Sequence, residues 1–263
     1  MLKKKGNVEV TQLDGFHLLE KLFNETIQQE PFKSYSKPEL YNKLDIVWAI
    51  IEKEYFRINA ENKKDMQQSW NNNNGYFYEK VILDYLNSEL KGKGIEVYNM
   101  GKRDYYKMPP DLWDEIKDSL RASITRKCVN QRYHLKLQVE LDLLAIDTSS
   151  HGIITSLTCK TRFRERVYQP LYASRHLINI RTAFITMDRD VNLKTCEKPS
   201  EKRALLETFM DAVFVNSSND KLGFCSMIHP FSDIVPTLLE WKRINGLEKD
   251  QQHVALRKAQ GTH

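Results

Sequence analysis

Residues 139–169, VELDLLAIDTSSHGIITSLTCKTRFRERVYQ, carry the strongest structural signal in the chain. Two runs rich in Val, Ile, Leu and Thr, at 137–146 and 152–160, flank a turn made of Asp, Ser and Gly residues. This pattern predicts two strands joined as a hairpin. The first run contains Asp142, with Glu140 two residues earlier, and the second ends at Lys160. The hairpin therefore brings an acid and a lysine together on neighbouring strands.

A carboxylate and an ammonium group are costly to bury unless they pair with each other or hold a metal ion. A structural ion pair at a strand end is one explanation of Asp142 and Lys160. The surrounding charge favours a functional one. Residues 160–181 contain six basic residues and one acid, and residues 121–136 contain five basic residues and no acid. Two basic blocks around an acid-lysine pair suit a polyanion that must meet a metal-bound carboxylate.

These residues resemble the PD-(D/E)xK nuclease core, in which an acid at a strand end is followed, one hairpin later, by a lysine. Asp142 and Lys160 match those two positions, and Thr158 replaces the acid that usually precedes the lysine. The same departure is found in the restriction endonucleases that recognise CCGG, CCNGG or CCWGG, which also carry an Arg-(Asp/Glu)-Arg triplet. Here the triplet is Arg164-Glu165-Arg166, shortly after Arg162. The resemblance is specific over about 30 residues and loose over about 100.

One feature of that branch is absent. Its members usually supply a further metal-binding Glu thirteen residues after the lysine, and here that position is Ala173. Either another acid completes the site, the helix predicted to start near Tyr168 has a different register, or the chain departs from this branch. The resemblance implies that Glu79, on an N-terminal helix, contributes to the metal site. A solvated or packing role for Glu79 is the alternative.

The resemblance also implies how the chain reads DNA. An arginine can form two hydrogen bonds with guanine in the major groove, and a glutamate can accept one from cytosine. Arg164, Glu165 and Arg166 therefore have the groups needed to read GG:CC steps, with Arg162 as a further DNA-binding residue. Glu165 could instead be the missing metal ligand, but its place between two arginines favours base reading.

The predicted fold class is α/β, a mixed central sheet flanked by helices, restriction-endonuclease-like, with a helical N-terminal part. Apolar spacing predicts helices over 13–27, 37–56 and 76–90 and a helix over 109–125. A loop is expected over 71–75, and strands are expected within 92–100 and 178–188. We expect a helical region at 1–70 packed on a nuclease core at 71–247. A polar, frayed tail is expected at 248–263.

Composition allows this interpretation without requiring it. The chain has 263 residues, 41% hydrophobic residues and a formal net charge of +5. This length can bury a sizeable core without disulfides. Four widely separated cysteines exclude a CxxC zinc motif, and Cys159 is expected to face away from Lys160 as a buried thiol. No run is long enough to span a membrane, so a cytoplasmic location is expected.

The function implied is Mg²⁺-dependent cleavage of double-stranded DNA at a short palindromic site by a homodimer, with a cognate DNA methyltransferase as a partner. Two alternatives remain open at this stage. A RecB-like repair or recombination nuclease would use the same Asp142 and Lys160 without reading sequence, and residues 169–172, Gln-Pro-Leu-Tyr, loosely resemble a motif of that group. A non-catalytic DNA-binding protein is the other alternative.

Overall fold

The computed structural model describes residues 12–58, 63–101, 104–118, 120–128, 131–138, 141–161, 180–189, 193–219, 222–224 and 227–260. A six-stranded sheet lies at its centre, with the strand order β1-β4-β5-β6-β7-β8. Strands β1 (Ile95–Asn99), β4 (Leu143–Asp147) and β5 (Ile153–Lys160) are antiparallel neighbours. Strands β6 (Arg181–Thr186), β7 (Ala212–Val215) and β8 (Ile228–Pro230) continue parallel to β5. The predicted mixed α/β sheet is confirmed.

Alternating residues of the central strands pack on opposite faces of the sheet. On one face Leu143, Leu157 and Ile185 join a large core with the N-terminal helices and with α8 (Ile234–Gln260). On the other face Phe184 and Val213 pack near α7 (Glu201–Phe209), while Leu144 packs with residues of α5 (Pro110–Ile116). The sheet is therefore buried on both sides, as expected for a sheet covered by helices.

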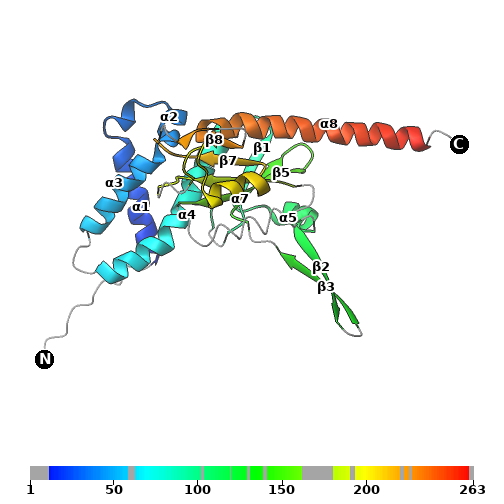
Figure 1. Cartoon of the computed structure of the whole chain (residues 1–263), viewed down its shortest axis with the longest axis horizontal. Coiled ribbons are helices and arrows are strands. Elements are labelled where there is room, and N and C mark those ends of the chain that lie inside the picture. The colour runs from blue at the N-terminus through cyan, green and yellow to red at the C-terminus, as the bar shows by residue number, and fades with distance from the viewer. Residues whose placement is uncertain are drawn as a thin grey trace.

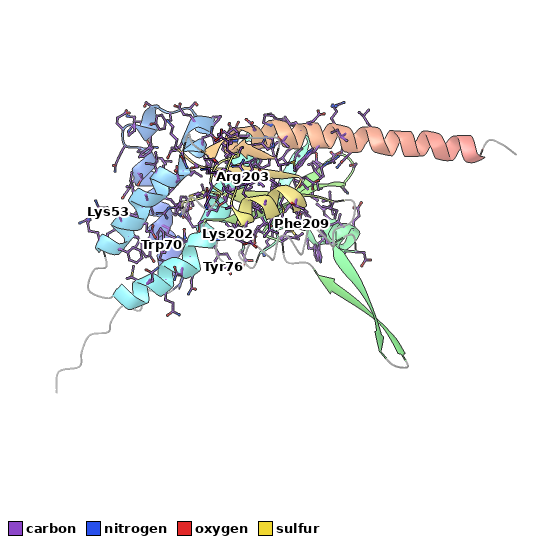
Figure 2. All side chains as sticks on the ribbon, in the orientation of Figure 1. Lys53, Trp70, Tyr76, Lys202, Arg203 and Phe209 are labelled. Atoms are coloured by element: carbon purple, nitrogen blue, oxygen red, sulfur yellow. The ribbon has the colours of Figure 1, made fainter. Side chains whose placement is uncertain are left out.

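The N-terminal helices form a bundle at one side of the sheet (Figure 1). It consists of α1 (Gln12–Ile27), α2 (Lys37–Asn42) and α3 (Leu44–Ile58), with the short helix η1 (Phe32–Ser34) between the first two, and it packs on α4 (Lys63–Leu90). Figure 2 marks Trp70 and Tyr76 on α4. Trp70 is buried against Tyr55 and Phe56 of α3. Helix α4 therefore joins the bundle to the sheet.

Two predictions of secondary structure were wrong. The loop expected at 71–75 lies inside α4, where Asn73 and Asn74 are buried. The Asn74 amide is hydrogen-bonded to Trp48 and Thr161, far away in the chain, and the Asn73 amide to Ser69 one turn earlier in the same helix. Tertiary contacts there outweigh the low helix propensity of asparagine. The helix expected over 109–125 ends at Ile116. Residues from Arg121 onward pair instead with a later segment.

That segment forms a separate two-stranded ribbon. Strands β2 (Arg121–Cys128) and β3 (Gln131–Gln138) pair antiparallel with each other and form their own sheet. The ribbon projects away from the body beside α5 (Figure 1). The first run of the predicted hairpin is consequently divided, since β3 ends at residue 138 and β4 begins at 143.

The last helix follows η5 (Phe231–Asp233) and extends well beyond the sheet (Figure 1). It continues to Gln260, so the tail expected to fray from 248 is helical up to that residue. The boundary expected at residue 70 falls within α4. The division into three regions stays a prediction. Among the described residues, every helix is too short or too polar to cross a membrane.

Candidate active site

The central antiparallel hairpin brings Asp142 and Lys160 into direct contact. Asp142 lies immediately before β4, and Lys160 is the last residue of β5. Oδ2 of Asp142 accepts hydrogen bonds from Lys160 Nζ at 2.6 Å and from the backbone N–H of Cys159 at 2.9 Å. The Asp142 carbonyl accepts a further bond from the N–H of Met100, beyond the end of β1. The predicted pairing at facing strand ends is confirmed, and its catalytic role stays a prediction.

Glu79 joins this pair from helix α4. Glu79 is only 7% exposed, so it is not a solvated surface residue. Burial and the negative charge of Asp142 raise its pKa to about 8, against a smaller opposing effect of Lys160. The two carboxyl groups are therefore close enough to repel each other. Gly101 leaves room nearby, since a side-chain carbon at that position would lie 3.9 Å from Glu79 Oε2 and 3.0 Å from Asn99 Oδ1.

The lysine is held in its charged form. Burial alone would lower the pKa of Lys160, but Asp142 and ionised Glu79 raise it, and the net direction is upward. Lys160 is thus suited to electrostatic stabilisation rather than to accepting a proton near neutral pH. The neighbouring Cys159 is a buried free thiol whose pKa is raised by burial, as expected for a residue facing away from Lys160.

The donor set fits a hard divalent cation. Asp142 and Glu79 offer carboxylate oxygens, and strand ends offer backbone carbonyl oxygens, which Mg²⁺ prefers. Burial and the repulsion by Asp142 keep Glu79 protonated, and a cation between the two acids would offset both effects. In the described part of the chain, no three His, Cys, Asp or Glu side chains form a ready-made metal cluster. Water and a substrate phosphate would complete the coordination of the ion.

A hydrogen-bond chain that the sequence did not reveal supports the end of β5. The buried amide of Asn74 accepts a bond from the Trp48 indole at 2.5 Å and donates one to Thr161 Oγ1 at 3.2 Å. Indole N–H is only a donor, so it fixes which way the amide faces. Thr161 directly follows Lys160. Helix α4 thus anchors the strand that carries the lysine. The sequence did not indicate this contact, because the asparagine run at 71–74 was predicted to be a loop.

We expect Asn74→Ala to lower the free energy of unfolding by about 1 to 3 kcal/mol, because it leaves buried partners without hydrogen bonds. Denaturant titration measures the loss. Asn71→Ala is the matched control on the same helix, since Asn71 is exposed and accepts a bond only from the exposed Gln67 among the bonds described for its side chain. Equal unfolding midpoints for the two variants would contradict the anchoring role of Asn74.

The remaining predicted residues lie outside the described part of the chain. They are Glu140, Arg162, Arg164, Glu165 and Arg166, together with Ala173 and the helix predicted from Tyr168. The described residues of this region end at Thr161 and resume at Ile180. Of the predicted site residues, Asp142, Lys160 and Glu79 are described, and they come together.

Comparison with known proteins finds one matching family model. The family model of the BsaWI restriction endonuclease type 2 matches residues 116–236, which include Asp142 and Lys160. The matched part of the chain, a little under half of it, is similar to the type II restriction endonucleases. The matched segment covers the hairpin, the arginine triplet and the parallel strands, so the resemblance inferred from the hairpin is confirmed. No curated protein matches the chain significantly.

Two solved structures are similar to this chain, and the first of them supports its fold. The crystal structure of the specific restriction endonuclease AgeI in complex with DNA matches with a TM-score of 0.55 and 17% identity, covering 92% of this chain and 94% of that one. Metal-depleted Ecl18kI in complex with uncleaved, modified DNA matches at 13% identity and a TM-score of 0.36, over 89% and 85% of the two chains. The first match extends the fold to nearly the whole chain, including the helical N-terminal region.

Proposed function

We propose that this protein is a Mg²⁺-dependent site-specific endonuclease that cuts double-stranded DNA at a short palindromic site containing GG:CC steps. The family match supports a type II restriction endonuclease, and the contact between Asp142 and Lys160 beside the buried Glu79 carries the proposal. A cognate DNA methyltransferase would protect the host DNA from the same sequence.

Each charged group has a distinct task in phosphodiester hydrolysis. A carboxylate-bound Mg²⁺ lowers the pKa of an attacking water and offsets the charge that develops on the phosphate. Asp142 and Glu79 would hold the ion, and the backbone N–H of Cys159 keeps the Asp142 carboxylate oriented. Lys160, charged and hydrogen-bonded to Asp142, would stabilise negative charge on the nucleophile or on the scissile phosphate. Glu140 is a further candidate catalytic acid.

Sequence recognition would come from the segment that follows the lysine. Arg164 and Arg166 would each donate two bonds to a guanine, and Glu165 would accept from cytosine. A homodimer would present one triplet to each half-site, because two-fold symmetry in the protein matches a palindrome in the DNA. Arg162 would contact the same duplex.

The decisive experiment is digestion of plasmid DNA with Mg²⁺, followed by sequencing of the ends produced. Discrete fragments whose ends share a GG:CC-containing palindrome are the expected result. Ends scattered over unrelated sequences would favour the RecB-like nuclease instead. Retained DNA binding without cleavage under Mg²⁺, Mn²⁺ and Co²⁺ would favour a non-catalytic DNA-binding protein.

We expect Arg164→Ala and Arg166→Ala each to cost about 1 to 3 kcal/mol of discrimination between the cognate duplex and single-base variants. Binding titrations with Ca²⁺, which is expected to permit binding without cleavage, measure this directly. Arg57→Ala is the control, because Arg57 pairs with Glu54 on the exposed face of α3. Losses of equal size on every sequence would assign both arginines to the DNA backbone rather than to bases.

A further inference from the structure

The two-stranded ribbon formed by β2 and β3 has one polar face and one mostly apolar face. Successive residues of a strand lie on opposite faces, and the register pairs Arg121 with Gln138 and Lys127 with Arg132. One face therefore contains only polar or basic positions: Arg121, Ser123, Thr125, Lys127, Arg132, His134, Lys136 and Gln138. The other contains mostly apolar positions: Ala122, Ile124, Arg126, Cys128, Gln131, Tyr133, Leu135 and Leu137.

Four of the five arginines and lysines of the ribbon thus share one face, and Arg126 alone of these five lies on the other. On this face, the register partners nearest to the end of β2 are Lys127 and Arg132. Like charges in such a pair destabilise a ribbon. An anion bound across that face would remove the cost, so the arrangement favours a ligand with closely spaced negative charges.

The position of the ribbon in the fold indicates which polyanion this is. Asp142 lies four residues beyond the end of β3, so the base of the ribbon is within about 13 Å of it. Each strand has eight residues and spans about 27 Å, which matches roughly eight base pairs of duplex. The ribbon projects from the body beside α5 (Figure 1). DNA bound at the candidate active site would pass next to it.

We propose that the polar face of this ribbon is a phosphate-binding arm, which holds the DNA backbone next to the cut site without reading its sequence. This inference rests on the proposed function, because it assigns a second surface to the same duplex. Contacts with phosphates orient a protein on DNA, whereas contacts with base edges specify the sequence. The ribbon would supply the first kind, and the arginine triplet the second.

Neighbouring residues on opposite faces give a matched test. Lys127→Gln and Arg126→Gln each remove one positive charge from adjacent positions, and only the first lies on the polar face. Duplex affinity would be measured by fluorescence anisotropy with Ca²⁺ over a range of salt concentrations. Lys127→Gln should reduce the slope of log affinity against log salt by about 0.9, and adding Arg132→Gln should bring the reduction to roughly 1.8. Cognate and unrelated duplexes should lose affinity alike.

Arg126→Gln should keep the wild-type slope. Equal slopes for all variants, equal losses for Arg126→Gln and Lys127→Gln, or a loss confined to the cognate duplex would each overturn the proposal. So would a change in sedimentation of the free protein without a change in slope, which would assign the face to a second copy of the chain. Lys136→Gln provides the same test if the double variant does not fold, as judged by thermal unfolding.

The two proposals fail in different ways. If the wild-type protein cuts a discrete site but the Lys127 and Arg132 variants keep its salt slope, only the arm is wrong. If the wild-type protein neither binds nor cuts duplex DNA under Mg²⁺, the nuclease assignment fails and the arm falls with it.

Discussion

Asp142→Ala and Lys160→Ala should each slow DNA cleavage by at least about a hundredfold, the scale expected when a metal ligand or a charge-stabilising contact is lost. Both side chains meet at Asp142 Oδ2, so either change leaves the other group without its partner. Specific binding in Ca²⁺ should survive in both variants, since the recognition triplet is elsewhere. Single-turnover cleavage of the cognate duplex, with binding measured in parallel, tests this expectation.

A second ion pair on the same strand provides the control. Asp147, at the other end of β4, contacts Lys242 of α8 at 3.1 Å and is also partly buried. Burial would raise the pKa of Asp147, but hydrogen bonds from Ser149, Ser150 and Lys242 lower it to about 2. Asp147→Ala should therefore reduce stability at neutral pH, with that loss shrinking as the pH falls toward 2, and leave cleavage near normal. Near-normal cleavage by Asp142→Ala would make the first pair structural too.

The parts of the site that lie close together in the chain could be predicted from the sequence. A hairpin with a short turn fixes which residues face each other, so Asp142 and Lys160 could be paired from spacing alone. Glu79 is distant in sequence, and only the family resemblance indicated it. Its burial beside Asp142 reflects the packing of α4 on the sheet, which local patterns do not encode.

The errors have a common physical cause. Residues 71–74 are all asparagine, a poor helix former, and their helix is stabilised by partners up to 87 residues away. The alternation of Arg121–Cys128 could have predicted a strand, but the helical start at Pro109 and Pro110 suggested a longer helix. In both cases pairing with another segment decided a structure that local propensity left open; that segment is distant in the chain for α4 and adjacent in the chain for the ribbon.

Glu79→Gln should raise the Mg²⁺ concentration needed for half-maximal cleavage by at least about tenfold, with a smaller effect on DNA binding. The resemblance places a further metal-binding acid at position 173, but this chain has Ala173 there. No carboxylate at that position could therefore compensate for the loss of Glu79. Metal titration of cleavage measures the shift. Glu25→Gln is the control, because Glu25 is an exposed residue of α1 that pairs only weakly with Lys21, at 3.8 Å. An unchanged titration would place Glu79 among packing residues.

Glu79→Gln should impair metal binding, but without metal it should stabilise the folded protein at high pH. Burial and Asp142 raise the pKa of Glu79 to about 8 in the folded protein, against 4.5 for an ordinary glutamate. The folded state therefore holds this proton more tightly than the unfolded state does. That contribution is complete below pH 4.5 and is lost as the pH rises toward 8. Glutamine keeps the neutral form at every pH, so the variant should escape the loss.

Denaturant unfolding in EDTA at pH 5 and pH 8.5 separates these cases. Glu79→Gln and wild type should unfold at similar midpoints at pH 5, and the variant should be the more stable by up to a few kcal/mol at pH 8.5. Adding Mg²⁺ at pH 8.5 should stabilise wild type more than the variant, since only the ionised carboxylate binds the cation. A variant that is less stable than wild type at pH 8.5 without metal would show that Glu79 serves the fold as an anion, and would remove the physical basis for assigning it to the metal.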